Sequence, residues 1–236
     1  MEKQKNGPRH VAFIMDGNRR WARSNKLKAL QGHTKGADII RPLVEYCAEY
    51  GISYLTFWAF STENWKRDEQ EVEHLMNLFR SFITGDLMRD LMENGVKLTT
   101  IGDLSKFPED IVRSIENVVD KSKNNTKITV IMALNYGGRE EILHAIKSMQ
   151  KSIGNSVSST ENVTEEEFEK YLYTAGVPDP DIIIRTGGEM RLSGHLPWQS
   201  VYSELFFTDT LWPDFTKDEL GNILEEYKRR ERRFGK

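Results

Sequence analysis

The most constraining feature of the sequence is a series of short, almost wholly apolar runs separated by stretches with helical periodicity. Such runs are too uniformly apolar for strands with one face in water. They are typical of a parallel sheet covered on both faces, with a helix in each connection. We expect strands at His10–Met15, Tyr54–Phe60, Val96–Ile101, Lys127–Leu134, Asp181–Ile184 and Glu204–Phe207. The sequence therefore predicts an α/β fold with a mostly parallel central sheet of about six strands flanked by helices.

Helical stretches lie between these runs. Thr34–Tyr50 places its apolar residues on one face and is followed by Gly51, and glycine is favoured just after a helix. Glu69–Asn94 is expected to form one long helix. Further elements are helices at Pro108–Lys121, Arg139–Lys151, Thr164–Tyr173 and Thr216–Arg233, and a polar loop at Ser152–Val163. Because 236 residues fit one α/β domain and no repeat divides them, we expect a single domain over residues 1–236.

The composition argues against several classes of protein. A net charge of −3, with 38% hydrophobic and 29% charged residues, is ordinary for a globular protein and disfavours a nucleic-acid partner. The one cysteine, Cys47, allows no intrachain disulfide and is expected in the core. We find no signal-like N-terminus, and no run approaches the roughly 18 apolar residues of a membrane span. We therefore expect a cytoplasmic protein that meets any lipid in a pocket or by peripheral contact with a membrane.

Polar loops, three of which contain glycine, follow four of the expected strands. They are Asp16–Arg20, Ser61–Asn64, Asn135–Gly138 and Arg185–Gly188. In open α/β sheets, ligands bind just beyond the carboxyl ends of the strands. Since parallel strands end at the same edge, we expect these loops to line one site.

The first of these loops combines a carboxylate with cations. It holds Asp16, Asn18, Arg19 and Arg20, with His33 further along the chain. A carboxylate can hold a hard divalent cation, while arginines fork onto phosphate oxygens. The alternative is a capped turn whose arginines are solvated. Neither a GxxxxGK[ST] nor a GxGxxG pattern follows, which disfavours a P-loop NTPase and a dinucleotide-binding fold.

A second anionic group would fit the segment from Arg185 to Ser193, which also carries Arg191. Gly187 and Gly188 allow backbone N–H groups to approach an anion closely. An ordinary flexible loop has a similar composition, and this alternative stays open.

A third group of residues is apolar. Phe57, Trp58 and Phe60 lie on one expected strand, and the stretch from Leu75 to Met88 is apolar over more than one helical face. By default such side chains belong to the core. Beside two anion sites, an apolar cleft would instead suit an amphiphile with a diphosphate head and a hydrocarbon tail.

These residues occur in motifs that resemble the cis-prenyltransferase family, in particular its bacterial undecaprenyl diphosphate synthase branch. The matching segments are HVAFIMDGNRRWA at 10–22, Gly32-His33 with Gly36, and residues 59–65, 135–139, 184–193, 198–205 and 233–235. The resemblance covers about residues 9 to 235, in order and at similar spacings.

The resemblance implies one α/β domain, usually homodimeric, in which the sheet and two helices enclose a hydrophobic tunnel. The implied reaction adds isopentenyl diphosphate repeatedly to an allylic diphosphate, with farnesyl diphosphate as the expected starter, and leaves cis double bonds. Mg²⁺ is the implied cofactor and assists departure of the diphosphate. A long product such as undecaprenyl diphosphate is expected. The alternatives are a product of another length and a catalytically silent binding subunit, although a silent chain would have lost Asp16 or the paired arginines.

The resemblance also implies roles for individual residues. Asp16 and Asn64 are expected to be catalytic, and Asp16 and Glu204 to hold the metal ion. The terminal Arg233–Gly235 is expected to reach the neighbouring subunit's isopentenyl diphosphate site. Arg185, Arg191 and Ser193 are expected to bind isopentenyl diphosphate. The other substrate-binding positions, at or near the allylic diphosphate, are Gly17, Asn18, Arg19, Arg20, Trp21, His33, Ser61, Glu63, Trp65 and Arg67.

Two positions depart from the family pattern. The family often has an arginine four residues before the position of His33, where this chain has Ala29 preceded by Lys28, and a lysine cannot fork onto phosphate. Met190 stands where some members have a histidine near the metal. A phosphatase is the nearest rival enzyme, but it would carry a second aspartate two residues after Asp16.

Overall fold

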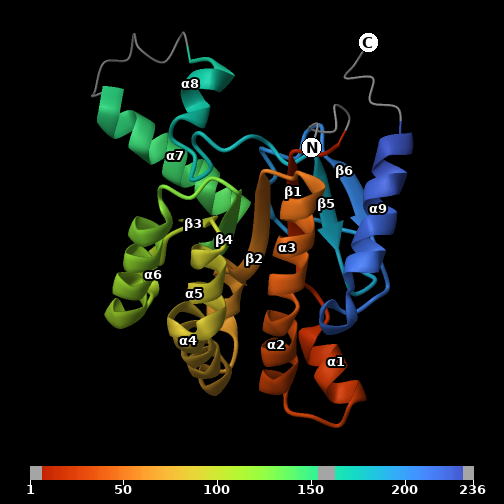
Figure 1. The fold of residues 1–236 in the computed structure, drawn as a ribbon. Coiled ribbons are helices and arrows are strands. Elements are labelled where there is room, and N and C mark those ends of the chain that lie inside the picture. Colours follow the sequence, from red (N-terminus) through yellow and green to blue (C-terminus); the bar gives the residue numbers. More distant parts are fainter. Residues whose placement is uncertain (1–6, 154–162, 231–236) are drawn as a thin grey trace.

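The computed structural model describes residues 7–153 and 163–230 and contains one six-stranded sheet (Figure 1). The strand order is β3-β4-β2-β1-β5-β6, and every neighbouring pair is parallel. The expected α/β fold with six strands is confirmed. The strands are β1 His10–Ile14, β2 Tyr54–Ser61, β3 Val96–Ile101, β4 Ile128–Tyr136, β5 Ile182–Arg185 and β6 Glu204–Phe207.

Helices cover the sheet and extend beyond the ends of its strands. In Figure 1, α1, α2 and α4 lie at the lower end of the molecule, and α7 and α8 at the opposite end. The helices are α1 Asn18–Ser24, α2 Ala29–Asp38, α3 Ile40–Tyr50, α4 Glu69–Thr84, α5 Asp86–Glu93, α6 Glu109–Ser122, α7 Gly138–Ile153, α8 Glu165–Glu169 and α9 Lys217–Arg229. Among the described residues, no helix is long and apolar enough to cross a bilayer.

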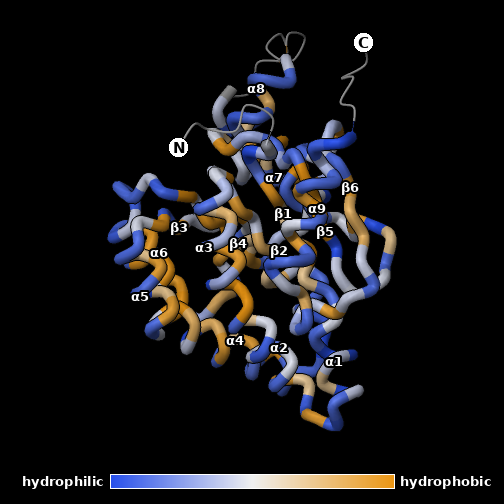
Figure 2. The backbone as a smooth tube through the Cα atoms, turned by 45° about the vertical axis from the view of Figure 1, so that its right-hand side comes forward, coloured by the Kyte–Doolittle hydropathy of each residue, from blue (hydrophilic) through white to orange (hydrophobic). Residues whose placement is uncertain are grey.

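Successive side chains of β1 point to opposite faces of the sheet, so the core has a separate part on each face. Val11 and Phe13 of β1 pack with apolar side chains of α3, α5 and α9 on one face of the sheet, whereas Ala12 and Ile14 pack on the other. A third cluster lies between α4, α6 and the ends of β2 and β4. Figure 2 shows hydrophobic stretches of α4, α5 and α6 beside the strands. Cys47 of α3 is completely buried, as expected.

Two helices that we predicted as continuous are interrupted. Thr34–Tyr50 is divided at Ile39 into the end of α2 and α3. Pro42 explains the break, because proline has no N–H for the carbonyl of Asp38 and its ring crowds that carbonyl. Glu69–Asn94 is divided into α4 and α5 at Gly85, whose backbone is extended.

Smaller differences occur elsewhere in the chain. The predicted loop Asp16–Arg20 is shorter than expected, because α1 begins at Asn18 and runs to Ser24. Only Glu165–Glu169 of the predicted Thr164–Tyr173 is helical, with the Thr164 hydroxyl capping the N–H of Glu167 as expected. Most of the predicted loop at Ser152–Val163, and the Arg233–Gly235 tail, lie outside the described residues.

Candidate active site

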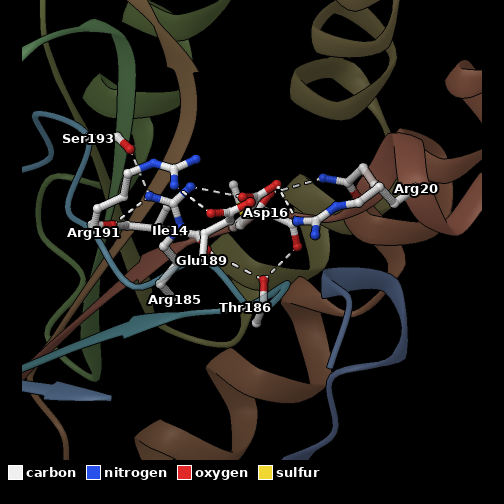
Figure 3. Close-up of polar contacts among 10 residues, drawn as sticks. Ile14, Asp16, Arg20, Arg185, Thr186, Glu189, Arg191 and Ser193 are labelled. Carbon is white, nitrogen blue, oxygen red and sulfur yellow. Dashed lines mark hydrogen bonds and ion pairs between the residues drawn. The ribbon is translucent and has the colours of Figure 1, made fainter. Parts of the chain in front are cut away.

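Two neighbouring strands bring Asp16 and Arg185 together at the carboxyl edge of the sheet. Ile14 pairs with Arg185 in the parallel register of β1 and β5, so that the residues following Ile14 lie beside the end of β5. Nη2 of Arg185 donates to Oδ2 of Asp16 at 2.9 Å (Figure 3). Arg20, one turn into α1, places Nη2 at 3.2 Å from Oδ1 of the same carboxylate. Both carboxylate oxygens are therefore held by guanidinium groups.

Arg185 and Arg191, which we expected to act alike, have different surroundings. Arg185 is 5% exposed, and its Nη1 donates to Ser193 Oγ at 2.7 Å and to the Arg191 carbonyl at 2.5 Å. The Arg191 side chain is 61% exposed and pairs with Glu189. Arg185 thus organises the loop, while Arg191 is the cation that stays open to a ligand.

Close contacts fix the loop Asp16–Arg20, the first loop, against the segment from Arg185 to Gln199, which we call the second loop. Thr186 Oγ1 donates to the Asp16 carbonyl at 2.7 Å, and the Trp212 backbone N–H donates to the same oxygen at 3.0 Å. Gly187 has a φ of +86°, and a Cβ there would lie 2.5 Å from Nη2 of Arg20. Sequence reasoning did not single out Thr186 or Trp212, and only the neighbouring Arg-Thr-Gly-Gly run signalled that this turn is tight.

The other side of Asp16 opens into a polar hollow of 390 Å³. Arg67 donates to Glu71 at 2.9 Å, and Arg19 lies 3.6 Å from the other oxygen of that carboxylate. We had not selected Glu71, which joins the first loop to the start of α4. The residues that line the hollow are Met15, Asp16, Gly17, Asn18, Arg19, Arg20, Arg23, His33 and Arg67.

His33 lines this hollow with a neutral ring. Burial, assisted by the charge of Arg67, lowers the pKa of His33 to about 4. Its buried Nε2 has no hydrogen-bond partner within the described part of the chain. The ring is therefore uncharged near neutral pH and has a nitrogen available for a ligand.

A second cavity of 310 Å³ extends from Asp16 toward the apolar interior. Its polar end includes Asp16, Asn18, His33, Ser61, Asn64, Arg67, Arg185 and Ser193. Its apolar end includes Ala59, Leu75, Leu78, Phe79, Phe82 and Met132. The last three of these also line a small adjoining apolar cavity of 30 Å³. The described residues thus form a cavity that becomes apolar toward the core.

Not every predicted substrate-binding residue lines these cavities. The Trp65 indole donates to Asn135 Oδ1 at 2.8 Å and packs against Phe60. The Trp21 indole donates to Asp214 at 2.7 Å. Glu63 is exposed and pairs with a neighbouring lysine. These three side chains, and those of Lys28 and Arg191, are absent from the lining of both cavities.

Glu204 does not join Asp16 in a metal site within one chain. It begins β6 and lies level with Ile182, hence with Val11, at the opposite end of the strands from Asp16. The rise of β1 alone separates the two levels by roughly 10 Å. Glu204 is instead paired with Arg230 at 2.8 Å. The expected Asp16–Glu204 pair is therefore wrong for one chain.

The donor set at Asp16 nevertheless suits Mg²⁺. That ion is commonly bound by one or two carboxylates, with substrate phosphates and water completing its coordination. Asp16 provides one such carboxylate, about a third exposed, at the mouth of both cavities. Among the described residues, no group of three acidic, histidine or cysteine side chains could hold a metal ion without such ligands.

The fold and the site together place a hollow lined by cationic side chains beside an apolar cavity, at the carboxyl edge of an α/β sheet. The chain matches the family model described as putative undecaprenyl diphosphate synthase over residues 14–235. An isoprenyl transferase of Clostridium perfringens is 46% identical over 228 residues, covering 97% of this chain and 90% of its own length. One of Thermotoga maritima is 47% identical over 97% of each chain.

Solved structures agree with this match. Lavandulyl diphosphate synthase from Lavandula x intermedia, in complex with dimethylallyl diphosphate, has a TM-score of 0.94 and 32% identity, covering 99% of this chain and 100% of that one. A probable undecaprenyl diphosphate synthase from Campylobacter jejuni has a TM-score of 0.82 and 34% identity, covering 98% and 100%. This chain belongs to the undecaprenyl diphosphate synthase family and is a prenyl-transferring enzyme. The expected family and enzyme class are confirmed.

Proposed function

We propose that this enzyme condenses isopentenyl diphosphate repeatedly onto an allylic diphosphate, preferably farnesyl diphosphate, to make a long cis-polyprenyl diphosphate such as undecaprenyl diphosphate. One observation carries the proposal: a single cavity has Asp16, Arg185 and Ser193 at its polar end and Phe79 and Phe82 at its apolar end. This polarity matches a substrate whose diphosphate stays at the rim while its hydrocarbon chain grows inward.

A shorter product is the second candidate. The small volume beyond Phe79, Phe82 and Met132 supports it, because a long chain needs these side chains to move apart. Either product is made by the same condensation, so the choice concerns where the chain stops.

The allylic diphosphate is assigned to the hollow beside Asp16. Arg19, Arg20 and Arg67 supply positive charge there, and neutral His33 supplies a hydrogen-bonding nitrogen. Ionisation of an allylic diphosphate moves negative charge onto the leaving oxygens, and preplaced cationic groups stabilise that charge. These residues therefore favour departure of the diphosphate without a general acid.

Asp16 would hold Mg²⁺ at the junction of the two cavities. When bound, the ion would supply further neutralisation of the leaving diphosphate. The Arg20 and Arg185 guanidinium groups keep the carboxylate oriented toward that junction.

Isopentenyl diphosphate is assigned to the second loop. Arg191 and Ser193 would hold its diphosphate, with the exposed Arg191 guanidinium making the main contact. Its double bond would then lie toward the allylic carbon near Ser61 and Asn64, which share the cavity. A diphosphate oxygen can accept the C2 proton, so no separate catalytic base is required.

We further propose a homodimer in the cytoplasm, with peripheral membrane contact during release of an apolar product. Exposed apolar side chains support an interface between two copies. Leu143 and Ile146 are 56% and 42% exposed on α7, and Val201 is 72% exposed in the segment before β6. The start of α7 lies against the segment that leads to Val201, because the Gly138 N–H donates to the Gly194 carbonyl at 2.8 Å.

The activity is tested by incubating the protein with farnesyl diphosphate, radiolabelled isopentenyl diphosphate and Mg²⁺. We expect label in a butanol-extractable lipid with Mg²⁺ present and none with excess EDTA. A folded protein that transfers no label from either farnesyl or dimethylallyl diphosphate would contradict the proposal.

A further inference from the structure

A buried polar cluster lies behind the second loop, outside both substrate cavities. It consists of Tyr136, Glu141, Thr174 and Gln199, which we call the Glu141 cluster. The Tyr136 hydroxyl donates to Glu141 Oε2 at 2.5 Å, and Gln199 Nε2 donates to the same oxygen at 3.1 Å. Gln199 Nε2 also donates to Thr174 Oγ1 at 2.7 Å. Three segments that are distant in sequence, at residues 136–141, 174 and 199, therefore meet in this cluster.

The cluster is costly to bury. Glu141 is 0% exposed, and burial raises the pKa of its carboxyl group. The amide oxygen of Gln199 has no partner among the residues that the structure describes, whereas the backbone of Tyr173 and Thr174 lies close enough to Glu141 to lower its pKa in part. A protein with buried polar groups that lack some hydrogen-bond partners is less stable than one with apolar side chains of the same shape in their place. A role beyond stability would explain such a cluster.

The loop that the cluster touches has a strained backbone. Ser193 and Leu196 have φ values of +52° and +48°, which residues other than glycine adopt at a cost. Such conformations persist only where the surroundings hold them. Arg185 holds the front of this loop through Ser193, and Gln199 holds its far end through Glu141.

The start of α7 supports the middle of the same loop. A Cβ on Gly138 would lie 2.0 Å from Pro197 Cδ, so loop and helix are in direct contact. His195 is completely buried, with its ring stacked on Trp58 at a centroid distance of 4.9 Å. Trp58 lines the 310 Å³ cavity, so a shift of the loop would also move a side chain of the site.

We propose that Glu141 and Gln199 are positioning residues, which fix the loop so that Arg191 and Ser193 can hold the diphosphate of the second substrate. The inference rests on the proposed assignment of isopentenyl diphosphate to this loop. Because the Arg191 side chain is exposed and paired only with the nearby Glu189 among described residues, its position depends on the backbone that the Glu141 cluster holds.

The test compares the KM values of the two substrates in three variants. Glu141→Leu replaces the carboxyl group, which accepts the hydrogen bonds, with an apolar side chain of similar size. We expect the KM for isopentenyl diphosphate to rise about tenfold, with the KM for farnesyl diphosphate changed less than about twofold. Glu141→Gln keeps an oxygen acceptor and should restore the KM to within about threefold of the wild-type value. Tyr136→Phe removes only one hydroxyl group, and it serves as the test variant if Glu141→Leu does not fold.

Ser122→Ala is the matched control. Its buried hydroxyl accepts from the Leu98 N–H at 3.0 Å, near the opposite edge of the sheet from the loop. This variant should lower the melting temperature and leave the ratio of the two KM values unchanged. If Glu141→Leu and Tyr136→Phe behave in the same way, the cluster is only structural and the positioning role is wrong.

Arg191→Ala separates failure of this inference from failure of the substrate assignment. If Arg191→Ala raises the KM for isopentenyl diphosphate and the Glu141 variants do not, the positioning role is wrong and the assignment stands. If Arg191→Ala leaves that KM unchanged, the assignment is wrong and the positioning role falls with it.

Discussion

At the scale of single residues, the site depends on one carboxylate that is about a third exposed and on one buried cation. Asp16 offers its oxygens to Arg20 and Arg185, and Arg185 in turn holds the carbonyl of Arg191. Asp16 therefore has two functions, since it neutralises buried Arg185 and faces both cavities. A change at Asp16 should affect chemistry first and stability second.

Asp16→Ala should reduce Mg²⁺-dependent turnover by about a hundredfold or more, because a group placed to stabilise developing charge is lost. The far-ultraviolet circular dichroism should stay unchanged, while the melting temperature falls modestly because Arg185 loses a partner. The control is Asp214→Asn, which keeps an acceptor for the Trp21 indole and lies outside both cavities. Near wild-type turnover in Asp16→Ala would refute the metal assignment.

Buried histidines should make stability depend on pH. Burial lowers the pKa of His10 to about 4 and that of His195 to about 3. Between pH 6.5 and about 4 the unfolded chain binds these protons and the folded chain does not, so the free energy of unfolding falls as the pH falls. Asp179 opposes this trend, because burial raises its pKa to about 6.

His195→Phe isolates one of these contributions. It keeps an aromatic ring against Trp58 and removes the titrating group. Compared with the wild type, its free energy of unfolding should fall less steeply between pH 6.5 and 4, by about 1.4 kcal/mol per pH unit. Urea unfolding at several pH values measures the difference. Parallel curves for the two proteins would show that His195 takes up no proton on unfolding in this range.

At the scale of elements, the apolar runs and the polar loops were better guides to the structure than helical periodicity was to where each helix ends. The six strands followed from uniformly apolar runs, and the carboxyl-edge loops followed from Asp16 and Arg185 at strand ends. The breaks at Ile39 and Gly85 were missed because amphipathic periodicity continues through both, although Pro42 and Gly85 are local signals of an interruption. The tertiary partners of the site, such as Glu71, give no local signal because the contacts form only on folding.

The turn after β5 provides a test at this scale. Gly187→Ala forces an alanine into the left-handed backbone conformation, which costs about 1–2 kcal/mol. It also places a Cβ 2.5 Å from Arg20 Nη2. Gly51→Ala is the matched control, since its φ is +91° and a Cβ there meets nothing within 4 Å. Both variants should lower the melting temperature, but only Gly187→Ala should lower kcat. Equal activity in both would mean that the tight turn does not position Arg20.

At the scale of the whole molecule, a charged rim opens into an apolar interior. The cavity begins at Asp16 and reaches α4 and β4, where Phe82 and Met132 separate it from the smaller cavity. The sequence predicted both ends of this arrangement but not its depth, because side-chain packing between α4 and the sheet decides how far the cavity extends. Product length depends on that packing.

Ala59→Leu should shorten the products. Ala59 lines the cavity, and a larger side chain there obstructs the growing hydrocarbon while the first addition proceeds. The alternative is overpacking, which costs about 1–3 kcal/mol and lowers the melting temperature without changing product lengths. Ala133→Leu serves as the overpacking control, because Ala133 is completely buried and does not line the cavity. Thin-layer analysis of the products distinguishes the two, and an unchanged ladder from folded Ala59→Leu would exclude obstruction.

Leu143→Glu should weaken the proposed dimer. A charge on the exposed apolar face of α7 would be buried unpaired between two copies, which is costly. Sedimentation velocity should show a dimer for the wild type and a larger monomer fraction for the variant. Leu27→Glu, at a residue that is 40% exposed between α1 and α2, is the control and should remain dimeric. A monomeric wild type would rule the dimer out.

Characterisation of the product shows whether the enzyme adds isopentenyl units in cis to a chain whose diphosphate stays at the rim of the cavity. The enzyme is incubated with farnesyl diphosphate, Mg²⁺ and ¹³C-labelled isopentenyl diphosphate, and the lipid is analysed by mass spectrometry and ¹³C NMR. We predict masses that increase by whole labelled isoprene units, and labelled carbons with the shifts of cis double bonds. Labelled trans double bonds, or a product without regular isoprene increments, would contradict the account.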